Sequence, residues 1–254
     1  MDKSFEEWKS DVEKRVELFN ASNYATAVTD CAVCLGKGLH AYVRHTQGNA
    51  SMATEDCDCK RLLSQADKLR LCGMPELVRR CGFDNYHIAA PWQAELCKTV
   101  RACADTEKWL LLCGQSGSGK THLAAALCRE LLCRGKSVLC VCWPETVRRL
   151  IAAGFERESL LQPLLNAQVL FVDDLFKSGA DQTRGVSRQE LDIAFTVVEH
   201  RSRLDKRTLI TTELLSRELE RLSEGLFGRI SQCCGSFICN IARARERNHR
   251  LKTA

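Results

Sequence analysis

The chain has 254 residues, of which 45% are hydrophobic and 27% are charged. This composition suits one α/β domain plus a smaller module and excludes a chain dominated by disorder. The net charge of +5 is too small to indicate nucleic-acid binding by itself. No apolar run reaches the roughly 18 residues of a membrane span, and the first residues lack the pattern of a signal peptide, so we expect a cytoplasmic protein.

The sixteen cysteines would indicate disulfides in a secreted chain. Most of them lie inside apolar runs here, among them Cys113, Cys128, Cys140 and Cys142. We therefore interpret these as reduced core residues.

The N-terminal residues have the spacing of an amphipathic helix. Apolar side chains recur every three or four residues with charges between them, at Phe5, Trp8, Val12, Val16 and Phe19. Such a face must be covered by another surface, so a separate module is predicted here.

Two close pairs of cysteines follow this helix. Cys31 and Cys34 have C-x-x-C spacing and resemble a zinc knuckle, whereas Cys57 and Cys59 have the tighter C-x-C spacing. A module of about 70 residues has a poor core without a metal. We therefore predict a structural zinc site with these four thiolates as ligands, which folds the module and does no chemistry. Four unrelated free cysteines are the alternative interpretation.

Helix breakers mark a domain boundary near residue 72. Gly73, Pro75, Gly82 and Pro91 interrupt the chain, so we interpret residues 73–91 as a connector onto the next domain. The predicted domains are residues 1–72 and 73–254.

Residues 114–121 match G-x-x-x-x-G-K-[ST] at every fixed position. The apolar run at 109–113 predicts a buried strand before them, and a helix is expected from Lys120 onward. Glycines let backbone N–H groups face a polyphosphate at a helix N-terminus, where Lys120 reaches the β and γ phosphates and Thr121 holds Mg²⁺. The predicted loop for ATP or GTP comprises Gly114, Gln115, Ser116, Gly117, Ser118, Gly119, Lys120 and Thr121, with His122 next to it.

Apolar runs suited to buried strands recur through the second domain, with helical stretches between them. They lie at 109–113, 137–142, 169–173, 208–212 and 236–241. This alternation predicts an α/β fold in which a five-stranded parallel sheet has helices on both faces. Ser187 and Glu190 have capping-box spacing at the start of one helix. Its expected apolar face is Leu191, Ala194, Phe195 and Val198.

The third of these strands ends in two carboxylates, Asp173 and Asp174. In a doubly wound sheet the carboxyl end of a strand lies beside the phosphate loop. Asp173 is therefore expected to hold Mg²⁺ with Thr121, and Asp174 to orient or polarise the attacking water. Two adjacent acids alone are equally typical of a solvated turn. The phosphate loop favours a hydrolysis site.

Hydroxyls and arginines complete the candidate site. Thr211 and Thr212 end the fourth strand and could touch the γ-phosphate, although threonine is also a common structural residue in strands. Surface arginines are more often solvated than catalytic, yet phosphoryl transfer often uses one from a neighbouring subunit. The basic residues near the C-terminus are Arg229, Arg243, Arg245, Arg247, Arg250 and Lys252, against the single acid Glu246.

Six segments together resemble the AAA+ ATPases of the bacterial and phage DnaC-type helicase loaders. They are residues 82–86 (Gly-Phe-Asp-Asn-Tyr), 114–121, 169–179, 209–214, 227–230 and 247–252, so the likeness spans nearly the whole chain. It implies that Asp173 is the Walker B acid that faces the metal ion. Asp174 would then occupy the position of the catalytic carboxylate. The resemblance further assigns Thr212 to sensor 1, Arg229 to the arginine finger, and Arg243 or Arg247 to sensor 2.

The chain departs from this pattern at two positions. The commoner sensor 1 residue is asparagine, and Asp174 is shorter than the usual glutamate. Slow turnover fits both departures.

The resemblance implies an AAA+ P-loop ATPase core preceded by a small helical, zinc-bearing module. It also implies an ATP-dependent loader that uses Mg²⁺ and self-associates through the ATPase domain. Such a loader binds a DnaB-type replicative helicase through the face of Phe5 and Trp8, and helps place this helicase on single-stranded DNA. Three alternatives stay open. They are a transposition helper ATPase of the IstB type, a small-molecule phosphotransferase, and a module that binds nucleotide without hydrolysing it.

Overall fold

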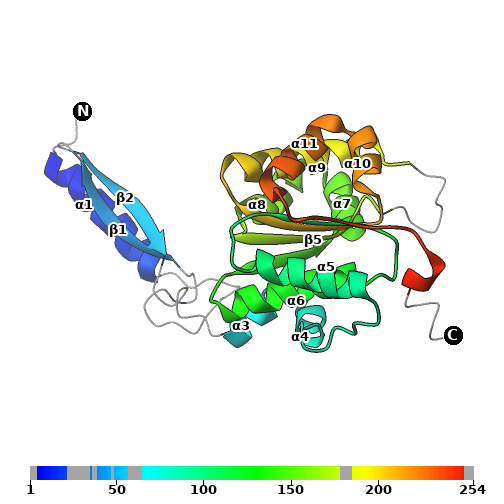
Figure 1. Cartoon of the computed structure of the whole chain (residues 1–254). Coiled ribbons are helices and arrows are strands. Elements are labelled where there is room, and N and C mark those ends of the chain that lie inside the picture. The colour runs from blue at the N-terminus through cyan, green and yellow to red at the C-terminus, as the bar shows by residue number, and fades with distance from the viewer. Residues whose placement is uncertain are drawn as a thin grey trace. The chain divides into compact units, whose positions relative to one another are not determined.

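The computed structural model describes residues 5–21, 35, 39–46, 49–56, 65–177 and 185–248 (Figure 1). The chain divides into two compact units, residues 1–66 and 67–254. The boundary expected from the sequence lies near residue 72. The intervening segment belongs to the second unit because Lys68 Nζ donates to the Gly135 carbonyl at 2.6 Å and Cys140 N donates to the Cys72 carbonyl at 2.7 Å.

The first unit combines a helix with a β-hairpin. Its elements are α1 (Phe5–Ala21), β1 (Leu39–Thr46) and β2 (Asn49–Asp56). The strands pair antiparallel, with Leu39 opposite Asp56. Asn20 at the end of α1 fastens the helix to β1, since its amide donates to the Ala41 carbonyl at 3.0 Å and accepts from the Ala41 N–H at 2.9 Å. The N-terminal helix is confirmed, and the expected small helical module also contains a β-hairpin that the sequence did not predict.

The second unit is a five-stranded sheet in the order β4-β5-β6-β3-β7, and every neighbouring pair is parallel. The strands are β3 (Leu110–Gly114), β4 (Val138–Cys142), β5 (Val169–Leu175), β6 (Arg207–Thr212) and β7 (Ile238–Ile241). Each of the five predicted strands is confirmed to within a few residues.

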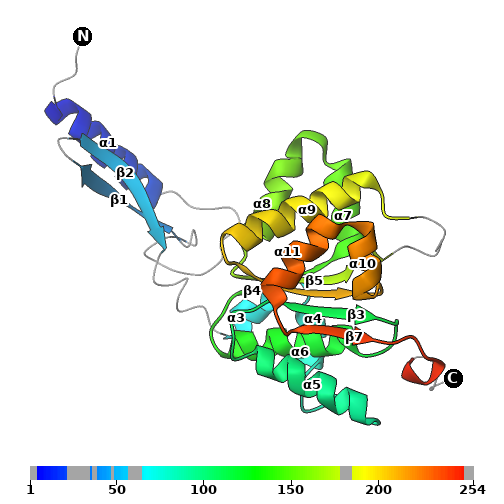
Figure 2. The same ribbon diagram turned by 45° about the horizontal axis from the view of Figure 1, so that its top comes forward.

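Helices cover both faces of this sheet. They are α3 (Gln65–Arg70), α4 (Pro75–Arg80), α5 (Pro91–Cys103), α6 (Lys120–Cys133), α7 (Trp143–Ala152), α8 (Arg157–Asn166), α9 (Arg188–Arg203), α10 (Ser216–Leu222) and α11 (Glu224–Cys234), with short 3₁₀ turns at Gly154–Glu156 and Arg245–Arg247. Figure 2 shows α5 and α6 on one face and α8, α9 and α11 on the other. None of the described helices is long and apolar enough to cross a membrane.

Strand β3 joins two apolar cores because alternate side chains of a strand point to opposite faces. Leu111 belongs to the core under α7 to α11, whereas Leu110 and Leu112 belong to the core under α5 and α6. Cys128 and Cys140 are buried in the second core, and the cysteines of the described residues are free thiols. The interpretation as reduced core residues is confirmed for Cys113, Cys128 and Cys140, whereas Cys142 at the end of β4 is only half-buried.

Helix α9 is rotated relative to the predicted face. Phe195 is 40% exposed, and Ile193 and Val197 are buried instead. Ser187 caps the helix, accepting from the Glu190 N–H at 3.1 Å, but the Glu190 carboxylate accepts from Trp143 Nε1 at 2.8 Å. The N-cap is confirmed, and the predicted face is partly wrong.

The buried guanidinium of Arg201 explains this rotation. It donates to the carbonyls of Leu164 at 2.8 Å, Ala167 at 2.9 Å and Arg207 at 2.6 Å. Burial lowers the pKa of Arg201 to about 10. These carbonyls hold the Arg201 side chain between α8 and β6, so the face of α9 that contains Arg201 packs against the sheet.

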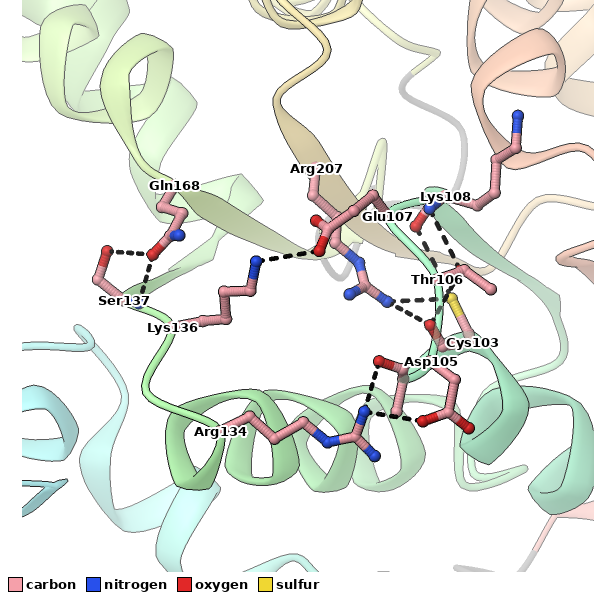
Figure 3. A network of polar contacts seen from close by, with 11 residues as sticks. Cys103, Asp105, Thr106, Glu107, Lys108, Arg134, Lys136, Ser137, Gln168 and Arg207 are labelled. Atoms are coloured by element: carbon pink, nitrogen blue, oxygen red, sulfur yellow. Dashed lines mark hydrogen bonds and ion pairs between the residues drawn. The ribbon is translucent and has the colours of Figure 1, made fainter.

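A polar network ties together the segments around the amino ends of the strands (Figure 3). Arg207, the first residue of β6, donates to the Cys103 carbonyl at the end of α5 at 2.6 Å. Lys136 pairs with Glu107 at 3.0 Å, and the Ser137 N–H donates to Gln168 at 2.8 Å. These contacts join the segments at the amino ends of the strands to one another. The carboxyl ends of the strands are therefore part of a rigid scaffold.

Candidate functional site

The loop between β3 and α6 lies at the carboxyl end of the sheet, next to the ends of β6 and β7. Gly114, Gly117 and Gly119 have φ values of 117°, 73° and 90°, which side-chain-bearing residues rarely adopt. A Cβ on Gly114 would overlap the carbonyl oxygen of Ile241, and one on Gly119 would lie 2.8 Å from Cε2 of Tyr86. Glycine is therefore required at both positions by backbone shape and by space.

Lys120 begins α6 and turns back over the loop. Its ammonium donates to the carbonyls of Gly114 and Gln115, both at 2.7 Å, and the residue is only 5% exposed. Burial lowers the pKa of Lys120. A cation held in this way beside a helix N-terminus is suited to bind an anion of high charge.

Asp173 and Thr121 meet at the rim of the loop, as the sequence predicted. Thr121 Oγ1 donates to Asp173 Oδ1 at 2.9 Å, and Thr211 Oγ1 donates to the same oxygen at 2.6 Å. Burial raises the pKa of Asp173. The chain thus brings together the hydroxyl and the carboxylate that were assigned to Mg²⁺, although they come from α6 and β5.

Asp174 lies beside this pair and is held by a residue that the sequence analysis missed. Its Oδ2 forms an ion pair with Lys177 Nζ at 2.8 Å, and the same ammonium lies 3.3 Å from Glu213 Oε1. The Asp174 N–H donates to Thr211 Oγ1 at 2.9 Å. Lys177 lies two residues after β5 and Glu213 directly follows β6, so extending the strand-end argument by two residues would have identified both.

These residues line a pocket of about 430 Å³. Its walls are Leu77, Arg80, Cys81, Ser116, Gly117, Ser118, Gly119, Lys120, Thr121, His122, Asp173, Asp174, Lys177 and Glu213. The connector closes one side: a ring nitrogen of His122 lies 2.9 Å from the Gly82 carbonyl, and the rings of His122 and Tyr86 are 5.4 Å apart. The predicted loop residues from Ser116 to His122 therefore share one cavity with Asp173 and Asp174.

The Thr212 hydroxyl is not brought to this pocket. Thr212 is fully buried at the end of β6, where its Oγ1 donates to the Leu175 carbonyl at 2.7 Å and accepts from the Leu214 N–H at 3.2 Å. Both contacts hold the ends of β5 and β6 together.

Arg229 also lies outside the pocket, on α11. Its Nε forms an ion pair with Glu199 Oε2 of α9 at 2.7 Å, and it lines a separate cavity of about 650 Å³ with Lys108 and Asp205. Arg229 therefore does not contribute to the nucleotide pocket of its own chain, and its action on a neighbouring subunit stays a prediction.

The candidate sensor 2 arginines follow β7. Arg243 pairs with Glu218 at 2.8 Å, and the guanidinium of Arg247 lies 5.2 Å from the ring centroid of Trp92. Neither lines the pocket. The segment touches the phosphate loop through its backbone, since the Ala244 N–H donates to Gln115 Oε1 at 2.6 Å.

Cys31, Cys34, Cys57 and Cys59 lie outside the described residues, so the zinc site stays a prediction. Within the described ranges, no group of three or more His, Cys, Asp or Glu side chains is arranged to hold a metal ion.

Comparison with known sequences gives three informative matches. YqaM of Bacillus subtilis (strain 168), described as uncharacterized, is 31% identical over 213 residues, which cover 78% of this chain and 67% of that protein. The phage-like element PBSX protein XkdC of the same strain is 29% identical over 247 residues, covering 88% and 86%. The replicative helicase loader DnaC of Escherichia coli (strain K12) is 31% identical over 162 residues, covering 59% of this chain and 62% of the loader.

Solved structures share the fold. DnaI superposes with a TM-score of 0.55 at 21% identity, covering 71% of this chain and 98% of DnaI. The DnaC helicase loader superposes with a TM-score of 0.51 at 22% identity, covering 66% and 98%. The profile of the family described as IstB-like ATP binding protein matches residues 52–222, which include the phosphate loop, Asp173 and Lys177. The chain therefore belongs to the IstB-like ATP-binding proteins, the AAA+ family that also contains the DnaC-type helicase loaders.

Proposed function

We propose that the chain hydrolyses ATP and uses this reaction to load a DnaB-type replicative helicase onto single-stranded DNA. One observation carries the enzymatic part: Thr121, Asp173 and Thr211 are joined through one carboxylate oxygen at the rim of a phosphate loop. The 31% identity to a replicative helicase loader supports the biological part.

The residues present fit ATP with Mg²⁺. Gly114 and Gly119 let the loop backbone pack where a Cβ would meet Ile241 or Tyr86, and Lys120 supplies a buried cation that lines the pocket beside the loop. Thr121 and Asp173 are oxygen donors of the kind that Mg²⁺ prefers, and they would hold it. When bound, Mg²⁺ would offset the charge of the β and γ phosphates.

As part of this proposal we assign the orientation of the attacking water to Asp174. Its carboxylate lines the same pocket as Lys120 and Thr121, and it is separate from the oxygen that Thr121 and Thr211 share on Asp173. Removing Asp174 should therefore slow hydrolysis while leaving nucleotide binding in place. This division of roles separates a hydrolase from a module that only binds nucleotide.

The test is release of phosphate from ATP with Mg²⁺, with and without single-stranded DNA. We expect slow release by the wild-type chain, none by Lys120→Ala, and slower release by Asp174→Asn at unchanged ATP affinity. Lys136→Ala is the control, because Lys136 pairs with Glu107 at the amino ends of the strands, whereas the pocket lies at their carboxyl ends. Tight ATP binding without phosphate release under both conditions would show a binding module.

The helicase-loading role rests on the N-terminal unit. The resemblance assigned helicase binding to the face of Phe5 and Trp8 on α1, but Val12 of that face is buried. Leu18, on another side of the same helix, is 71% exposed, and we propose it as a contact with the helicase. Co-purification with a DnaB-type helicase, followed by mass measurement of the complex, tests this role. Leu18→Asp should weaken the complex, and Glu17→Gln on the same helix is the control. Capture by a transposase instead of the helicase would favour a transposition helper, the alternative that the name of the family suggests.

We also retain the zinc site as part of the proposal. The register of the hairpin supports it, since Leu39 pairs with Asp56 and the chain therefore enters and leaves at the same end. Cys34 precedes Leu39 by five residues, and Cys57 directly follows Asp56. The two cysteine pairs thus flank one hairpin in the sequence, which supports a shared structural zinc ion as part of this proposal.

A further inference from the structure

The turn that follows β5 is unusual. Asp174 and Phe176 both have φ values in the left-handed region, 60° and 58°, although neither is glycine. Residues of this kind are rare and persist where the surrounding structure fixes them, often at functional sites. The turn therefore presents the residues around it in a defined direction.

Apolar contacts hold this turn. Leu175 and Phe176 are buried, and the Phe176 ring packs edge-on against Trp143 with centroids 6.4 Å apart. The Lys177 N–H donates to the Asp174 carbonyl at 3.1 Å, which closes the turn. With Phe176 anchored in the core, Lys177 is directed into the nucleotide pocket that it lines.

Two carboxylates hold the ammonium of Lys177 there. Asp174 lies at 2.8 Å and Glu213 at 3.3 Å, and the Lys177 side chain is 32% exposed. Burial opposes the charge of the ammonium, but the hydrogen bond to Asp174 and the charges of both acids outweigh it and raise the pKa of Lys177. The pocket thus contains a charged lysine in addition to the lysine of the phosphate loop.

The hydroxyls at the end of β6 cannot take the same position. Thr211 donates to Asp173, and Thr212 donates to the Leu175 carbonyl between the strands. Among the other basic side chains that line the pocket within the described residues, Arg80 belongs to α4, and Lys120 and His122 belong to α6. Lys177 is the cation that the ends of β5 and β6 supply, directly beside the carboxylate expected to orient the water.

We propose that Lys177 binds the terminal phosphate of ATP and thereby distinguishes ATP from ADP. This inference rests on the proposed function of the same pocket. The γ-phosphate competes with Asp174 for the ammonium, so its arrival transfers Lys177 to the nucleotide and leaves Asp174 able to accept a hydrogen bond from water. ADP lacks that phosphate, so the ion pair between Lys177 and Asp174 persists when ADP binds.

The test compares the affinities for ADP and for AMP-PNP, a non-hydrolysable ATP analogue, with Mg²⁺ present. Lys177→Met should weaken AMP-PNP binding about tenfold or more relative to ADP, because one charge-assisted contact is lost. Lys177→Arg should keep most of the preference. Glu213→Gln should raise the affinity for AMP-PNP more than that for ADP, because it removes a competing carboxylate.

Lys136→Met is the matched control. Lys136 is also an ion-paired lysine, 3.0 Å from Glu107 and 35% exposed, but it lies at the opposite edge of the sheet (Figure 3). This variant should bind both nucleotides as the wild-type chain does. If Lys177→Met lowered the affinities for ADP and AMP-PNP equally, or changed neither, the inference about Lys177 would be overturned. The proposed function of the pocket would still stand. A wild-type chain that binds neither nucleotide would overturn the proposed function itself.

Discussion

Replacement of Gly119 by alanine tests the shape of the phosphate loop, with Gly135→Ala as a matched control. The two glycines lie at opposite ends of α6 and have similar φ values, 90° and 84°. A Cβ at Gly119 would lie 2.8 Å from the Tyr86 ring, whereas at Gly135 the nearest atom is Lys68 Nζ at 3.9 Å. Both variants carry backbone strain, but only Gly119→Ala adds a steric clash.

The expected magnitudes follow from this difference. A left-handed alanine costs about 1–2 kcal/mol, and overpacking against an aromatic ring adds about 1–3 kcal/mol. For a unit of this size, each kcal/mol lowers the melting temperature by about 2–4 °C. We therefore expect a fall of about 2–8 °C for Gly135→Ala and about 4–20 °C for Gly119→Ala.

Thermal unfolding and nucleotide binding together check this reasoning. Gly119→Ala should also lose ATP affinity, because the Cβ forces the loop away from the position it takes beside Lys120, whereas Gly135→Ala should bind ATP normally. Tyr86→Leu should recover part of the stability lost in Gly119→Ala, since the two residues are in contact. Equal destabilisation by both alanines, with unchanged ATP affinity in Gly119→Ala, would refute the steric argument.

Three further predictions concern charge, metal and assembly. Lys120→Ala should abolish nucleotide binding without unfolding the chain, whereas Asp174→Asn should retain ATP and hydrolyse it more slowly; equilibrium binding and phosphate release measure the two effects. Freshly prepared, reduced protein should carry about one zinc ion per chain by elemental analysis, and Cys31→Ser or Cys34→Ser should release it while the ATPase unit stays folded. Mixing Arg229→Ala with Lys120→Ala should restore activity above the sum of the two separate variants, because one supplies an intact phosphate loop and the other supplies the arginine.

The sequence predicts the sheet and the phosphate loop well because both depend on local patterns. Runs such as 169–173 are apolar throughout, which is typical of strands buried on both faces. The glycines of 114–121 are required by backbone conformation, so their spacing alone identifies the loop. The pairing of Thr121 with Asp173 follows from the same rule, since parallel strands end at one edge.

The hairpin and the face of α9 could not be predicted in the same way. Strand β1 contains His40, Arg44 and His45, so its apolar alternation is weak. In α9 two overlapping stripes fit the helical period, one with Phe195 and one with Ile193. The choice depends on Arg201, whose burial becomes favourable only when the carbonyls of α8 and β6 are already in place.

Side-chain direction limited the assignment of the catalytic hydroxyl. Thr212 lies at the expected strand end, but its hydroxyl bonds the Leu175 carbonyl because the strand pairing shifts register between Val172 and Leu175. The same irregularity follows from the left-handed Asp174 and directs Lys177 into the pocket. The position of a polar side chain at a strand end is therefore set by one or two backbone angles, which residue spacing does not encode.

The position of Arg229 allows the function in trans that the mixing experiment tests. A neighbouring nucleotide must draw the guanidinium away from Glu199, with which it pairs at 2.7 Å. The Arg229 side chain is half-exposed, which lets its guanidinium leave the pair, whereas the Glu199 side chain is only 15% exposed. Glu199 also pairs with Arg203, so the carboxylate keeps a cation if Arg229 leaves. Because a triphosphate carries several negative charges, we expect the exchange of one carboxylate for it to be favourable. In this proposal the intrachain pair holds the arginine near the surface until a second subunit binds.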